Sequence, residues 1–199
     1  LLGNESKEQA LIRIVQELAN NGLNIFQLRA KNISDSEQID ILRNLKKALL
    51  NTQTKICIND SVNVASRAGD FVDILHLGQS DMHPEKAKSF INDRIKIGLS
   101  ITKESQTRNI PDCVSYIGVG PIYKTNSKND AEKPIGETIL KQILEKVNIP
   151  VVAIGGIDLN NVSNLFSLGV SGVAVISNIL NNENPLKNFL LLKEKIKKD

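Results

Sequence analysis

Helical and strand-like patterns alternate along this chain from residue 6 onward, and this alternation constrains the fold more than any other feature. Strands are expected at residues 25–28, 55–58, 73–77, 95–99, 116–119, 151–154 and 172–176. Helices are expected at residues 8–19, 34–50, 61–68, 84–91, 138–147, 159–168 and 185–196, with one more beginning at residue 103. Because strands separated by helices form parallel βαβ units, the sequence predicts an α/β protein with a parallel sheet.

The number of elements favours a closed barrel over an open, doubly wound sheet. The pattern contains eight helices but seven strands, and it begins on a helix. We therefore expect a (β/α)₈ TIM barrel whose first strand lies before Leu1. No linker or shift in composition divides residues 1–199, so a single barrel domain is expected. The chain starts without a methionine, which leaves open whether this domain is the C-terminal part of a longer protein.

The composition excludes several classes of protein. Of the 199 residues, 41% are hydrophobic and 24% are charged, as in ordinary globular domains, and the two cysteines are expected to be reduced. A net charge of +3 does not indicate a nucleic-acid partner. No apolar run approaches the roughly 18 residues of a membrane span, and no signal peptide opens the chain. We expect a cytoplasmic protein, or an organelle stroma protein if a transit segment was removed, without a membrane partner; a homodimer is left open.

Charged side chains follow the first predicted strand. Gln27, Arg29 and Lys31 share one face, and Leu28 and Ala30 share the other, because side chains alternate along a strand. A solvated edge strand would show the same alternation, but parallel strands are normally buried on both faces. Since functional groups gather at the carboxyl ends of barrel strands, the two cations indicate an anion site there.

Two carboxylates follow the next two strands. Asn59 and Asp60 end the strand at residues 55–58, and Asp81 lies shortly after His76 at the end of the following one. Taken alone, Asn59 and Asp60 would equally suit a helix cap. Carboxylates on neighbouring strand ends beside Arg29 suit Mg²⁺, which keeps several waters and bridges to substrate phosphates. His76 is interpreted as an inward-facing core residue or a residue of the substrate-site wall, and not as a base.

A second anion site is expected near the end of the chain. Thr125, Ser127 and Lys128 offer hydroxyls and an amine, although a flexible polar loop would have the same composition. The pair of glycines at residues 155–156 allows close backbone approach, and loops after the last two barrel strands commonly bind phosphate. Ser100, taken alone, would suit a helix N-cap. One metal-assisted and one metal-free anion site suggest a two-substrate transferase with a pyrophosphate leaving group.

Seven stretches of the chain resemble the thiamine-phosphate synthase family. They are residues 27–31, 58–60, 76–81, 98–100, 116–123 with 125–128, 153–157 and 172–177. Each is weak alone, but together they keep the family's order and span nearly the whole chain. The resemblance implies transfer of the 4-amino-2-methylpyrimidin-5-ylmethyl group from its diphosphate to 4-methyl-5-(2-phosphoethyl)thiazole, or to its carboxylated form. Pyrophosphate would leave by a dissociative route.

The resemblance also implies a role for each site residue. The pyrimidine diphosphate would contact Gln27, Arg29, Lys31, Asn59, Ser100 and Lys128, and of these Arg29, Lys31, Ser100 and Lys128 would act in catalysis. Asp60 and Asp81 would hold Mg²⁺. The thiazole phosphate would contact Thr125, Ser127, Gly156, Ile176 and Ser177. Ala30, Lys124, Ser127 and the residues after Ser100 depart from the family's usual pattern, which puts substrate affinity in doubt more than activity.

Two alternatives stay open. A thiazole tautomerase of the same superfamily is expected to use a histidine near Ser100, but Ile101 and Thr102 follow that serine here. A non-catalytic barrel that binds phosphate ligands is disfavoured by Asp60 and Asp81, because an acidic pair is costly without a cation.

Overall fold

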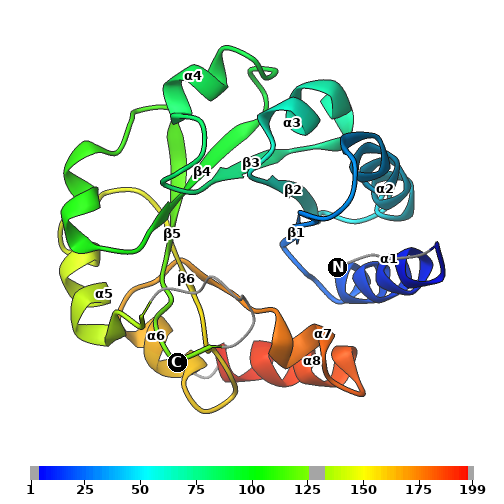
Figure 1. Cartoon of the computed structure of the whole chain (residues 1–199). Coiled ribbons are helices and arrows are strands. Elements are labelled where there is room, and N and C mark those ends of the chain that lie inside the picture. The colour runs from blue at the N-terminus through cyan, green and yellow to red at the C-terminus, as the bar shows by residue number, and fades with distance from the viewer. Residues whose placement is uncertain (1–4, 126–132, 197–199) are drawn as a thin grey trace. The chain divides into compact units, whose positions relative to one another are not determined.

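The computed structural model describes residues 5–125 and 133–196 (Figure 1). The chain divides into two compact units, Leu1–Gly98 and Leu99–Asp199. Whether both belong to the single domain expected from the sequence stays a prediction. Within the described part of the chain, no helix is long and apolar enough to cross a membrane.

The first unit alternates helices with parallel strands. Its elements are α1 (Glu5–Asn20), β1 (Ile25–Leu28), α2 (Asp35–Ala48), β2 (Lys55–Asn59), α3 (Val62–Ala68), the 3₁₀ helix η1 (Gly69–Phe71), β3 (Ile74–Leu77), α4 (Pro84–Lys88) and the first residues of β4 (Lys96–Ile101). β2 pairs in parallel with β1 on one side and with β3 on the other. α1 packs on α2, and α2 packs on α3 (Figure 1).

Local sequence explains why α2 begins where it does. Ser34 Oγ accepts a hydrogen bond from the Glu37 backbone N–H at 3.3 Å, and Glu37 Oε2 accepts one from the Ser34 N–H at 2.8 Å. This reciprocal capping box satisfies two N–H groups that the first turn of a helix leaves without partners. Behind the cap, Leu42 and Leu45 are fully buried and hold the helix in the core.

The second unit repeats the alternation. It contains the last residues of β4, then the 3₁₀ helix η2 (Glu104–Asn109), β5 (Val114–Val119), α5 (Gly136–Leu144), β6 (Val151–Ile154), α6 (Val162–Ser167), β7 (Gly172–Ala174), α7 (Ser177–Leu180) and α8 (Pro185–Ile196). β6 pairs in parallel with β5 on one side and with β7 on the other. α6 and α7 both pack on α8.

The described residues contain the seven strands that the sequence predicts, and in each unit the strands lie in chain order. The α/β class with parallel strands is therefore confirmed. The closed eight-stranded barrel stays a prediction.

Several predicted elements differ from the structure by one to three residues at their ends, as for α4 and α6. Two further differences concern the type of element. The helix expected from Lys103 is a short 3₁₀ helix, because Pro111 holds Ile110 in an extended conformation and leaves little room for an α-helix. The strand expected at residues 172–176 ends at Ala174, and the short helix α7 begins at Ser177. Four residues are too few to show helical periodicity, so α7 is not visible in the sequence.

Candidate active site

The ends of β1, β2 and β3 bring the predicted site residues of the first unit together. Leu28 pairs with Ile58, and Asn59 pairs with His76. Arg29 and Asp60 each follow directly on one of these paired residues. Parallel strands have their carboxyl ends at the same edge, so the side chains that follow gather there.

Asp60 has an unusual backbone conformation. Its φ is +66°, and among the described residues it is the one non-glycine residue with positive φ. Its N–H donates to the His76 carbonyl at 2.8 Å. Ser61, and not Asp60, caps α3, because Ser61 Oγ accepts from the Val64 N–H at 3.1 Å. The helix-cap interpretation of Asp60 is therefore wrong. Strained backbone of this kind is concentrated at functional sites.

Four charged side chains meet at Asp60. Burial raises the pKa of its carboxyl, and so do the charge of Asp81 and a side-chain hydrogen bond with Asp81, while Lys31 and Arg29 act in the opposite direction. The Lys31 Nζ lies 3.8 Å from Asp60 Oδ2. Two carboxylates and two cations thus share one small region.

The position of Asp81 is set by the end of β3. The Gly78 N–H donates to Asp81 Oδ2 at 2.7 Å, which folds the side chain back toward the strand. A Cβ on Gly78 would lie 3.1 Å from that same oxygen, so any residue larger than glycine at position 78 would crowd the Asp81 carboxylate. Asp81 is therefore held by backbone and is not a freely solvated loop residue.

The other candidates of the first unit flank this cluster. Gln27 is exposed on β1 and its Nε2 donates to the Cys57 sulfur at 3.4 Å, Asn59 is half-buried, and His76 is buried. No group of three or more His, Cys, Asp or Glu side chains in the described ranges could hold a metal by itself. A cation here would therefore depend on Asp60 and Asp81, the donor number that Mg²⁺ accepts when it shares phosphate oxygens and waters.

The second unit joins the ends of β5 and β6 through backbone contacts. The Ile122 N–H donates to the Ile154 carbonyl at 2.9 Å, and the Tyr123 N–H donates to the Gly155 carbonyl at 3.0 Å. Gly155 and Gly156 have φ of +98° and +66°. A Cβ on Gly155 would lie 2.5 Å from Pro121 Cβ. Only glycine fits this close approach.

The predicted phosphate-binding residues lie around this junction. Ile154 pairs with Ala174, so Gly156 and Ile176 each lie two residues beyond a paired position. Ile176 precedes α7 and Ser177 begins it. The carbonyl of Lys124, the residue before Thr125, would lie 2.6 Å from a Cβ on Gly156. Thr125 therefore follows directly on this junction.

The remaining predicted residues are Ser100, Ser127 and Lys128. Ser100 is half-buried within β4 and does not cap a helix, so the N-cap interpretation is wrong. Ser127 and Lys128 lie outside the described residues.

Sequence reasoning missed a hydrogen-bonded chain beside the loop that follows β5. The Tyr123 hydroxyl donates to Glu137 Oε1 at 2.5 Å, and Asn164 Nδ2 donates to Glu137 Oε2 at 2.6 Å. Burial and the hydrogen bond to Glu137 raise the pKa of Tyr123. These residues are 14 and 27 positions apart, so no local pattern connects them.

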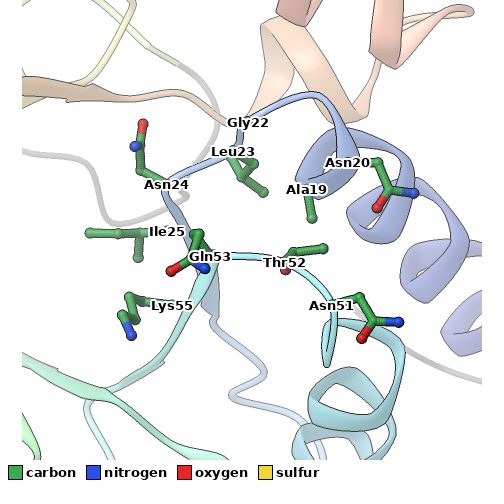
Figure 2. Close-up of a pocket in the computed structure, with 10 residues that line it drawn as sticks. All are labelled: Ala19, Asn20, Gly22, Leu23, Asn24, Ile25, Asn51, Thr52, Gln53 and Lys55. Carbon is green, nitrogen blue, oxygen red and sulfur yellow. The ribbon is translucent and has the colours of Figure 1, made fainter.

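The pocket in Figure 2 is at the opposite end of the first unit's strands. Its lining includes Gly22 and Asn24 before β1, Ile25 at the start of β1, and Gln53 and Lys55 at the start of β2 (Figure 2). Its polar side chains are amides, a hydroxyl and one amine, and it contains no carboxylate or imidazole. It is therefore separate from the candidate active site.

Comparison with known proteins points in one direction. A family model described as thiamine monophosphate synthase matches residues 2–179. The thiamine-phosphate synthase of Clostridium tetani (strain Massachusetts / E88) is 37% identical over 182 residues, which are 91% of this chain and 86% of the relative. That of Lactococcus lactis subsp. cremoris (strain SK11) is 34% identical over 183 residues, with 90% and 83% covered.

Solved structures agree. Thiamine phosphate pyrophosphorylase from Pyrococcus furiosus has a TM-score of 0.85 and 29% identity, over 98% of this chain and 93% of that one. A 3-hexulose-6-phosphate synthase has a TM-score of 0.70 at 13% identity, covering 95% of this chain and 94% of that one. The second likeness concerns the fold alone.

Proposed function

This chain belongs to the thiamine monophosphate synthase family and catalyses the synthesis of thiamine phosphate. We propose that each of the two units binds one of the two substrates. The first unit would bind 4-amino-2-methylpyrimidin-5-ylmethyl diphosphate, and the second would bind the phosphate of 4-methyl-5-(2-phosphoethyl)thiazole. The carboxylated thiazole phosphate is an alternative acceptor. The observation that carries this assignment is the cluster of Arg29, Lys31, Asp60 and Asp81.

The proposed reaction is dissociative. The bond between the pyrimidine methylene carbon and the diphosphate oxygen breaks, and pyrophosphate leaves with the electron pair. The lone pair of the thiazole nitrogen then forms a bond to the methylene carbon. Negative charge grows on the leaving oxygen, and Arg29 and Lys31 would stabilise it by preorganised electrostatic interaction. Ser100 and Lys128 are proposed to assist them, with Gln27 and Asn59 positioning the substrate.

Asp60 and Asp81 would hold the Mg²⁺ ion that the family implies. The chemistry of this pair fits a cation, because burial and the neighbouring Asp81 raise the pKa of Asp60, and a divalent ion would favour its ionised form. When bound, Mg²⁺ neutralises charge on a departing diphosphate.

The thiazole phosphate is proposed to lie on Thr125, Ser127, Gly156, Ile176 and Ser177. Backbone N–H groups at strand ends and short loops are suitable partners for a phosphate monoester. The two positive-φ glycines and the close contact between the β5 and β6 loops support this assignment. A closed (β/α)₈ barrel is the fold we propose for the complete enzyme; a cytoplasmic location and a homodimer stay predictions.

The experiment that tests this proposal combines both substrates with the protein and Mg²⁺. Thiamine phosphate and pyrophosphate should appear in equal amounts, and chelation by EDTA should stop both. Production without added metal, after EDTA treatment, would contradict the role of Asp60 and Asp81. A protein that consumes neither substrate would contradict the proposed reaction.

A further inference from the structure

The loop after β5 is closed at its base by its own backbone. The Ile135 N–H donates to the Pro121 carbonyl at 2.9 Å, and the Gly136 N–H donates to the Ile122 carbonyl at 3.1 Å. The two ends of the loop are thereby joined just before α5 begins. The segment from Pro121 to Tyr123 is also bound on its other side by Ile154 and Gly155.

Side chains extend this junction to two helices. The Tyr123 hydroxyl donates to Glu137 in the first turn of α5, and Asn164 on α6 donates to the other oxygen of the same carboxylate. Burial and Glu137 raise the pKa of Tyr123, so the phenol keeps its proton and remains a donor at neutral pH. Both carboxylate oxygens of Glu137 are therefore used by donors from different elements.

Gly156 lies against Tyr123 and Lys124, the two residues that precede Thr125. A Cβ on Gly156 would lie 2.6 Å from the Lys124 carbonyl oxygen and 2.7 Å from Tyr123 Cβ. The loop is therefore closely packed on Gly156, and a displacement of Tyr123 away from Gly156 would open this contact. A tie between Tyr123 and α5 opposes that movement.

We propose that Tyr123, Glu137 and Asn164 form a positioning triad that holds Thr125 against Gly156 and so determines the affinity for the thiazole phosphate. The inference rests on the proposed function, in which Thr125 and Gly156 bind that phosphate. The triad belongs to the second unit, whereas Asp60 and Asp81 belong to the first. Its loss is therefore expected to change the KM for the thiazole phosphate much more than the KM for the pyrimidine diphosphate.

The first test removes one hydroxyl. Tyr123→Phe should raise the KM for the thiazole phosphate roughly tenfold, the effect of losing one hydrogen bond to a charged group. The KM for the pyrimidine diphosphate should change by less than about twofold, because a change at one site has little effect on a second, independent site. Tyr116→Phe is the matched control, since it removes the other tyrosine hydroxyl of the chain from within β5.

The second test restores the triad with reversed polarity. Asn164→Asp places a second carboxylate against Glu137, so the KM for the thiazole phosphate should rise. Adding Glu137→Gln to that variant should bring the KM for the thiazole phosphate back toward its original value. The amide nitrogen introduced at position 137 would donate to the carboxylate at position 164, and the amide oxygen would still accept from Tyr123. A residue that served only the packing of the helices would show no such rescue.

The outcomes separate this inference from the function on which it rests. An unaltered protein that makes no thiamine phosphate would overturn both. An active protein whose Tyr123→Phe variant has a lower melting temperature but an unchanged KM for the thiazole phosphate would overturn the triad alone. An equal rise in both KM values would also count against it.

Discussion

In the first unit, the candidate site residues near the ends of β1, β2 and β3 carry charged side chains, whereas in the second unit a glycine follows directly on both β5 and β6. Arg29, Lys31, Asp60 and Asp81 interact through side chains. Gly155 and Gly156 lie against the backbone of the neighbouring loop. On the proposed assignment, the diphosphate, which gains negative charge during the reaction, would be met by preorganised charged side chains. The thiazole phosphate, which is only bound, would be met by backbone dipoles.

The largest expected effect comes from removing one charged side chain of the first unit. Arg29→Ala should lower kcat by about 10²–10³, because Arg29 would act on charge that develops as pyrophosphate leaves. The KM for the thiazole phosphate should change little. Steady-state kinetics with each substrate varied in turn measures both, and Arg13→Ala, at an exposed arginine on α1, is the control. Weaker thiazole phosphate binding at unchanged kcat would place Arg29 at the wrong anion site.

The next effect concerns the two carboxylates. Asp60→Asn and Asp81→Asn should each raise the Mg²⁺ concentration for half-maximal rate, on the order of tenfold, as the loss of groups around a metal typically does. Because both act through one ion, the double variant should lose less than the product of the two single losses. Titration of Mg²⁺ against initial rate tests this. Asp93→Asn, at a nearly fully exposed side chain, should respond like the unaltered protein; independent losses for Asp60 and Asp81 would refute joint coordination.

The close backbone contact in the second unit can be tested with two glycines of similar φ. Gly155 has φ +98° and no space for a Cβ, whereas Gly169 has φ +103° and nothing within 4 Å of one. Gly169→Ala should cost about 1 kcal/mol of unfolding free energy from backbone strain alone. Gly155→Ala should cost roughly 2–3 kcal/mol more, since clash with Pro121 adds to that strain. Urea unfolding of both variants measures the difference, and equal losses would mean that the close approach is unimportant.

The smallest effect compares one carboxylate from each unit, the exposed Glu37 and the half-buried Glu104. The hydroxyl and N–H of Ser34 lower the pKa of Glu37, while Lys146, by hydrogen bond and charge, lowers that of Glu104; both are normally near 4.5. Each therefore contributes stability that is present above pH 4.5 and is lost as the pH falls through the lowered pKa. Salt at about 0.5 M should return the pKa of Glu104 toward its ordinary value but affect Glu37 less, because screening acts on the ion pair. NMR titration at low and high salt measures both values.

Periodic elements agree well between sequence and structure. The strands expected at residues 25–28 and 151–154 and the helix at residues 185–196 have the same bounds in β1, β6 and α8. Their hydrophobic patterns and flanking turn residues are local, and local information is enough to define them. The α-helix expected from Lys103 is wrong because Pro111 holds Ile110 in an extended conformation. The helix α7 is not predicted because four residues are too few for a periodic pattern.

The sequence by itself determined the order of strands and helices and the residues that follow each strand, including Arg29, Asp60 and Asp81. Tertiary structure decided which of these side chains share a charge environment, and it set the positive φ of Asp60 through the bond to His76. It also brought Tyr123, Glu137 and Asn164 together from three separate elements. The physical reason is that strand pairing joins positions far apart in sequence, such as Gln27 with Cys57, 30 positions apart, and Ile154 with Ala174, 20 positions apart. Hydrogen bonds across such distances depend on packing, and no single stretch of sequence encodes them.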